Sequence, residues 1–254
     1  MVIRKAIFST LGAALFTLLL TPTTFAQNLP THAELRGVLK EIAAEDNGGA
    51  GANLWATVVD RDGMVKAVVF SGEERGDQWP GSRLIAAQKA NTANAFSLPE
   101  RALSTANLYS AVQPGGSLYG LQFSNPVDPA VAYAGASADI GLENDPMVDR
   151  KIGGVDVFGG GLALYNSEGE LLGALGVSGD NSCTDHNVAW KVRHRLNLDN
   201  IPEGVSPAGD DNIVYDIDPR DDTSRSGWGH PECSPEATRI AVQLAETRPT
   251  GPQP

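Results

Sequence analysis

Residues 161–178 read GLALYNSEGELLGALGVS, and they contain the pattern that decides the fold. Gly161 to Tyr165 is an apolar run of strand length, the polar residues 166–169 form a turn that ends in glycine, and Leu171 to Ser178 returns as a second strand. A helix is expected next, from about Thr184 to Leu196. This segment therefore predicts a β-hairpin followed by a helix.

The same pattern occurs once before in the chain. Leu54 to Val59 is rich in β-forming residues, Asp60 to Gly63 turns the chain, and Met64 to Phe70 returns. An alanine-rich helix follows through Phe96, with Ser82 as its expected N-cap, and a short helix is expected after it, from about Glu100 to Tyr109. A further helix is expected before the first hairpin, where Thr31-His-Ala-Glu34 forms a capping box. Two such units predict an α+β fold, in which one antiparallel sheet is built from two hairpin-plus-helix units with helices packed on it.

The first 26 residues have the features of a secretory signal peptide. Arg4 and Lys5 precede an apolar run from Ala6 to Leu20, and small residues at Thr24 and Ala26 predict cleavage after Ala26. A membrane anchor is the alternative, but the run is shorter than the roughly 20 residues that span a bilayer. The sequence therefore predicts a periplasmic or secreted protein.

Charge limits the partners of the mature chain. The net charge of the full sequence is −12, and removing Arg4 and Lys5 with the signal peptide leaves 17 basic against 31 acidic residues, a net charge of −14. Such an acidic chain is not expected to bind nucleic acid or anionic membrane surfaces. No second apolar stretch is long enough to span a membrane, so no span is expected after signal cleavage.

The remaining chain divides into a domain and an extension. Residues 27–196 form the predicted domain, interrupted by an Asp- and Gly-rich insertion at about 124–157. Residues 197–254 form a polar C-terminal extension, whose end from Arg248 is expected to be disordered. Its acidic pairs, Asp210-Asp211 and Asp221-Asp222, are expected to be solvated loop charges, and its few apolar residues predict weak docking.

The sequence contains two cysteines, Cys183 and Cys233. In an exported protein such a pair predicts a disulfide, which would tie the extension to the domain. The alternative is a zinc site, because the segments Cys183-Thr-Asp-His186 and His230-Pro-Glu-Cys233 offer two thiolates and two imidazoles. An oxidising compartment favours the disulfide, which leaves His186 and His230 as surface histidines or as ligands of a haem or metal.

Residues 113–122, QPGGSLYGLQ, form a glycine-hinged loop with large apolar side chains. Leu118, Tyr119 and Leu121 need a reason to lie in such a loop, since loops run mostly over the surface. Two explanations remain open: the side chains cover the core of their own subunit, or a partner or ligand buries them.

Four segments of the chain resemble the GlcG/HbpS-like family, also called the haem-degrading or haem-binding domain family. They are Ala56-Thr-Val-Val-Asp60 with Asp62-Gly63, Gln88-Lys-Ala-Asn-Thr-Ala93, the loop 113–122, and Gly173-Ala-Leu-Gly-Val-Ser-Gly179 followed by Asp185. The resemblance runs from about Thr31 to Leu196 without the insertion. Three features depart from the family pattern: the insertion, the tail, and the segment Phe158-Gly-Gly-Gly161, which has glycines where the family usually has proline.

This resemblance implies a haem- or tetrapyrrole-binding protein that binds, senses or degrades haem and forms a homo-oligomer. The expected ligand-binding residues are Lys89, Thr92, Leu118, Tyr119 and His186. Lys89 would pair with a carboxylate of the ligand, although an exposed, solvated lysine is the alternative. Two other functions remain open, namely an enzyme or accessory protein acting on a small organic acid, and a structural or sensing module without a ligand. No catalytic residue is identified.

Overall fold

The computed structural model describes residues 28–251, so the predicted signal peptide and the last three residues lie outside the described part. A four-stranded antiparallel sheet lies at its centre, in the order β2–β1–β4–β3. Its strands are β1 (Trp55–Asp60), β2 (Val65–Phe70), β3 (Gly161–Tyr165) and β4 (Leu171–Ser178). Both predicted hairpins are present and join through β1 and β4, which confirms the α+β fold.

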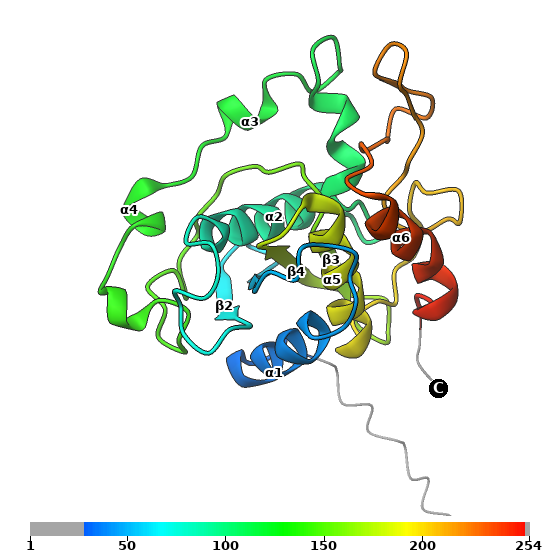
Figure 1. Ribbon diagram of the computed structural model, residues 1–254. Helices are drawn as coiled ribbons and strands as arrows, with labels where there is room; N and C mark the ends of the chain where they lie inside the picture. Colours follow the sequence, from blue (N-terminus) through cyan, green and yellow to red (C-terminus); the bar gives the residue numbers. More distant parts are fainter. Residues whose placement is uncertain (1–27, 252–254) are drawn as a thin grey trace, which may run out of the picture.

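Helices α1 (His32–Ala43) and α5 (Ser182–Arg195) cover one face of the sheet, and α6 (Pro235–Thr247) packs against α5 (Figure 1). The first begins as the sequence predicts, with a capping box between Thr31 and Glu34. Leucine and valine side chains from alternate strand positions meet these helices, because successive strand residues point to opposite faces. The larger of the two main cores lies in this layer.

Helix α2 (Ser82–Phe96) lies on the opposite face of the sheet and approaches it very closely. A Cβ at Gly176 would come within 1.9 Å of the carbonyl oxygen of Ala86, and a Cβ at Gly161 within 2.6 Å of the carbonyl oxygen of Lys89. These two glycines are paired across β3 and β4, so the helix backbone rests directly on the strands. Gly81, not the predicted Ser82, is the N-cap.

The insertion packs beside α2 and along the outer edge of the sheet (Figure 1). It contains α4 (Pro129–Ala132) and the 3-10 turn η3 (Ser137–Asp139), and it follows α3 (Leu121–Ser124). The backbone of Val65 in the edge strand donates to the carbonyl of Arg150 and accepts from the amide of Asp149, at 2.9 and 2.8 Å. The insertion therefore covers an edge that would otherwise present unpaired backbone groups.

The helix expected between the α2 segment and the glycine-hinged loop is replaced by two short 3-10 turns, η1 (Thr105–Leu108) and η2 (Ser110–Val112). In the loop that follows, Leu118 and Leu121 pack partly buried against a small core cluster, whereas Tyr119 is 62% exposed. Two of the three apolar side chains therefore cover their own subunit.

The C-terminal extension docks more firmly than its composition predicts. Within α6, Ile240 and Leu244 join the main core, and the indole nitrogen of Trp190 donates to the carbonyl of Arg248 at 2.9 Å. The amide of Gly251 donates to the carbonyl of Asp199 at 3.0 Å. Burial of a helix face therefore holds the extension as far as residue 251, which corrects the expectation of weak docking. A two-stranded ribbon, made of β5 (Ile217–Asp218) and β6 (Thr223–Ser224), precedes α6 in the sequence.

Asp210 and Asp211 are buried, which corrects the prediction that they are solvated loop charges. Asp211 accepts two hydrogen bonds of 2.7 Å from the guanidinium of Arg193, and both side chains are 0% exposed. This pair fixes the extension to α5. Asp221 and Asp222 are exposed, as predicted.

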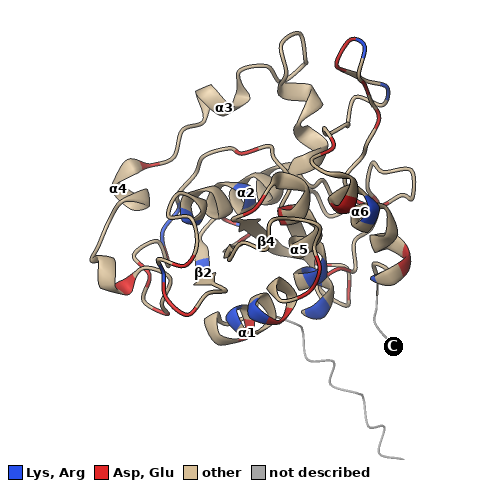
Figure 2. Cartoon of the chain, viewed as in Figure 1, with Lys and Arg blue, Asp and Glu red and all other residues tan. Residues whose placement is uncertain are grey.

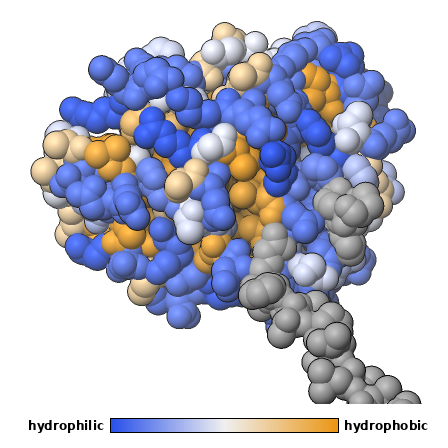
Figure 3. Space-filling view, turned by 90° about the horizontal axis from the view of Figure 1, so that it is seen from below, coloured by the Kyte–Doolittle hydropathy of each residue, from blue (hydrophilic) through white to orange (hydrophobic). Residues whose placement is uncertain are grey.

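Seen from below, the surface is mainly hydrophilic, and hydrophobic residues appear in separate patches (Figure 3). Within residues 28–251, no helix combines the length and the apolar character that a membrane crossing requires.

Candidate functional site

A buried ion pair lies where α2 meets the end of β4. The ammonium of Lys89 donates to Asp185 at 2.8 Å and to the carbonyl of Val177 at 3.1 Å, and both charged side chains are 2% exposed. The amide of Asp180 donates to the other carboxylate oxygen of Asp185 at 2.9 Å. Burial raises the pKa of Asp185 to about 6, and the charge of Lys89 opposes that rise. The alternative of a solvated lysine is therefore wrong.

A second carboxylate lies near this pair. Asp156 is 9% exposed, and burial raises the pKa of its carboxyl group, while the charge of Lys89 lowers it. The hydroxyl of Thr92 accepts from the amide of Asp156 at 3.0 Å, so α2 positions this residue. Lys89 is thus paired with one buried carboxylate, that of Asp185, and its charge also acts on a second, that of Asp156.

The histidine of the same helix turn is buried as well. His186 is 0% exposed, and its Nε2 lies 3.1 Å from Asn212 Oδ1 and 3.2 Å from the amide of Ile213. Burial lowers the pKa of His186 to about 4, so the ring is neutral at pH 7. Its Nδ1 has no hydrogen-bond partner within the described residues. This histidine is part of the core and not a surface residue.

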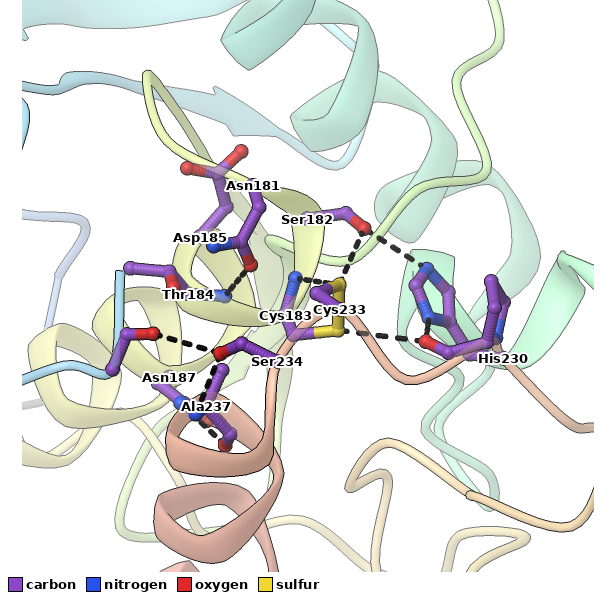
Figure 4. The surroundings of a disulfide bond; sticks show 12 residues. Asn181, Ser182, Cys183, Thr184, Asp185, Asn187, His230, Cys233, Ser234 and Ala237 are labelled. Atoms are coloured by element: carbon purple, nitrogen blue, oxygen red, sulfur yellow. Dashed lines mark hydrogen bonds between the residues drawn. A yellow bond between two sulfur atoms is a disulfide. The ribbon is translucent and has the colours of Figure 1, made fainter. Parts of the chain in front are cut away.

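The predicted disulfide is confirmed. Cys183 and Cys233 are joined at 2.03 Å, and the bond ties the start of α5 to the segment before α6 (Figure 4). Next to it, the hydroxyl of Ser182 lies 3.3 Å from His230 Nε2, and the His230 ring packs 5.1 Å from that of Tyr109. Burial also lowers the pKa of His230 to about 4.

The disulfide bears directly on the zinc alternative. Cys183, His230 and Cys233 place potential ligand atoms within 4.8 Å of one another, but both sulfurs are bonded to each other. His186 does not belong to this group, because its Nε2 faces Asn212. The four-ligand zinc site is therefore not formed.

A cavity lies elsewhere, between the segment that joins β2 to α2 and the insertion. Its volume is about 610 Å³, within the range of roughly 300–1,000 Å³ that is typical of small-molecule sites. Its lining is mainly apolar and includes Trp55, Pro80, Leu84, Ala132, Tyr133 and Ile140, together with Glu74, Arg75 and Arg83.

A buried ion pair fixes the insertion at this cavity. Arg83 donates from Nε to Asp145 Oδ2 at 2.9 Å and from Nη1 to the carbonyl of Ala132 at 3.2 Å. The same carboxylate accepts from the amide of Gly141 at 2.7 Å. The indole of Trp55 donates to the carbonyl of Trp79 at 3.0 Å, which orients one wall. The cavity is thus held by hydrogen bonds on both sides.

The five predicted ligand-binding residues do not converge on this cavity. Lys89, Thr92 and His186 are enclosed near the end of β4, and Leu118 and Tyr119 belong to the glycine-hinged loop. Their role in ligand binding stays a prediction. Asp156, Arg83 and the cavity were not predicted from the sequence. The one available signal for them was that an acidic insertion follows a helix with a basic residue, Arg83, in its first turn.

A sequence model of the family described as haem degrading protein HbpS-like matches residues 33–193. No curated protein matches the chain. A crystal structure of a PduOC–haem complex is 25% identical, covers 67% of this chain and 96% of its own, and has a TM-score of 0.47.

Two further solved structures are similar. The Klebsiella pneumoniae protein ORFY is 25% identical over 70% of this chain and 97% of its own, with a TM-score of 0.44. A double mutant of Streptomyces reticuli HbpS is 19% identical over 75% of this chain and 99% of its own, with a TM-score of 0.42. Because the family match spans well over half of the sequence and the fold carries both hairpin-plus-helix units, the chain belongs to the HbpS-like family.

Proposed function

We propose that this protein binds haem or a closely related tetrapyrrole. The observation that carries the proposal is the family match over residues 33–193, whose description names haem degradation. The structure offers a place of suitable kind, since a cavity of about 610 Å³ with mainly apolar walls suits a large flat apolar ring. Haem, when bound, supplies an iron centre with an open coordination position.

A titration of the mature protein with haemin tests this function. A saturable shift of the Soret band at about one equivalent per chain supports it, whereas the unsaturable change given by an unrelated acidic protein refutes it. The time course of the bound spectrum then separates storage from degradation, because a protein that only binds haem keeps the Soret band. Failure of haem binding would leave the organic-acid and ligand-free functions as the remaining hypotheses.

Export is part of the proposal. Its support is the basic start, apolar run and cleavage pattern of residues 1–26, together with the disulfide, since such bonds persist mainly in oxidising compartments. Expression with the native leader should give a periplasmic or secreted product that begins at Gln27. An exported product that retains Met1 would contradict the predicted cleavage.

Self-association is also proposed, and a specific surface supports it. Residues 102–127 contain no charged side chain, and within them Tyr119 is 62% and Phe123 85% exposed (Figure 2). In a chain with a strong net negative charge, an uncharged apolar surface is where two copies meet with least repulsion. Light scattering should show a mass above one chain, which Phe123→Asp lowers and Val242→Asp, at an exposed site on α6, does not. A mass of one chain at high micromolar concentration would rule the proposal out.

A further inference from the structure

We infer that the cavity between the β2–α2 segment and the insertion is the tetrapyrrole site, with Tyr133 as the iron ligand and Arg75 as the partner of a propionate carboxylate. This inference rests on the proposed function and assigns residues to it. The cavity is built by the insertion, which the family usually lacks, so its lining belongs to this chain.

The identity of the iron ligand follows from the lining. Protein side chains that bind haem iron are histidine, cysteine, methionine and tyrosine. Among the residues around this cavity, Tyr133 is the one member of that group. Tyr133 is 75% exposed, so its phenol oxygen is open to a ligand.

The partner of the carboxylate follows from charge. Arg83 is already occupied, since it is paired with Asp145 and bonded to the carbonyl of Ala132. Arg75 is exposed and makes no ion pair or side-chain hydrogen bond within residues 28–251. A guanidinium at the rim of an apolar cavity recognises a carboxylate well, because it donates two parallel hydrogen bonds. Glu74 lies beside Arg75 in the lining and carries the opposite charge. Its carboxylate repels anions and therefore disfavours ligands with more anionic groups.

The apolar walls complete the ligand class. Flat or branched hydrocarbon surface lines the cavity at Trp55, Pro80, Leu84 and Ile140. Contact with a porphyrin ring would remove this surface and the faces of the ring from water. A ligand that is flat, apolar, carboxylate-bearing and metal-centred uses each of these features. A small organic acid would use Arg75 alone and would leave most of the cavity unfilled.

Four variants test the assignment by absorbance titration with haemin. Tyr133→Phe should change the position of the Soret and visible bands and weaken binding at least tenfold. Arg75→Gln should leave the bands in place and weaken binding about two- to fivefold, as for an exposed ion pair. Ala134→Trp, at the half-buried mouth, should block binding. Arg220→Gln is the matched control for Arg75→Gln, because it removes an exposed guanidinium outside the cavity, and it should behave like the unaltered protein.

Metal-free protoporphyrin separates the roles of iron and cavity. Quenching of tryptophan fluorescence should report its binding, since Trp55 lines the site. Tyr133→Phe should bind this ligand as the unaltered protein does, whereas Ala134→Trp should not bind it. If the unaltered protein binds haemin and all three cavity variants match it in affinity and spectrum, the site assignment is wrong and the proposed function stands. If the unaltered protein fails to bind haemin, the proposed function and the assignment both fall.

Discussion

The buried pair of Arg193 and Asp211 gives the sharpest test of how the extension is held. Asp211→Asn keeps the shape of the side chain but removes its charge and turns one acceptor into a donor that faces the guanidinium. Both side chains are 0% exposed, joined by two hydrogen bonds of 2.7 Å, and Arg193 also donates to the carbonyl of Ala163 at 3.1 Å. The variant therefore leaves a charged guanidinium buried without its counter-ion.

The expected loss is large relative to the stability of a single domain. Removing one partner of a buried ion pair costs about 3–5 kcal/mol, since the remaining charge cannot be lost by titration of an arginine. Folded domains are stable by only about 5–15 kcal/mol in total. We therefore expect Asp211→Asn to lower the free energy of unfolding by roughly a fifth or more.

Urea unfolding at pH 7, followed by circular dichroism with the disulfide intact, measures this loss. Asp222→Asn is the matched control, because Asp222 is exposed, and its free energy of unfolding should change by less than about 0.5 kcal/mol. Replacing both partners, with Arg193→Met and Asp211→Leu, should recover much of the loss, since neither charge is then buried alone. A cost below about 1 kcal/mol for Asp211→Asn would refute the reasoning that the pair is desolvated.

Three further predictions follow from the structure. Replacing Cys183 and Cys233 by serine opens a loop of 50 residues and should cost up to about 4 kcal/mol of unfolding free energy, while hydrogen exchange should show α6 still protected, because its own apolar face is buried. Gly176→Ala should cost at least about 1–3 kcal/mol in urea unfolding, since the new methyl group overlaps the backbone of α2, and a near-neutral result would contradict that close approach. His186 has a native pKa of about 4 against about 6.5 when unfolded, so the unfolded state binds more protons at this site between these values; the contribution of His186 to stability should rise with pH from 4 to 6.5, and His186→Gln should remove that contribution from the measured pH dependence.

The local pattern of the sequence predicted most of the secondary structure. Both hairpins, the helix through Phe96 and the capping box at Thr31 depend on neighbours within a few residues, and each is present. The disulfide also followed from the sequence, since two cysteines in a chain that is predicted to be exported have one internal pairing. Family membership followed from the same short motifs.

Errors arose where burial depends on a distant partner. Asp211 looked like a solvated loop charge because its counter-ion, Arg193, lies on a helix that its own segment gives no reason to expect nearby. Lys89 looked exposed for the same reason, since Asp185 is 96 residues away. A charged side chain is buried in the core mainly when an oppositely charged side chain pairs with it. Which two side chains pair depends on how distant segments pack together.

The sequence by itself determined the two hairpins, the helices around them, the disulfide and the family. The tertiary structure alone decided which charges are buried, how α6 docks, and where a cavity opens, because each depends on surfaces brought together from separate segments. Arg75 and Tyr133 illustrate this most clearly: 58 positions apart in the sequence, they line one cavity because the insertion folds back over the start of α2.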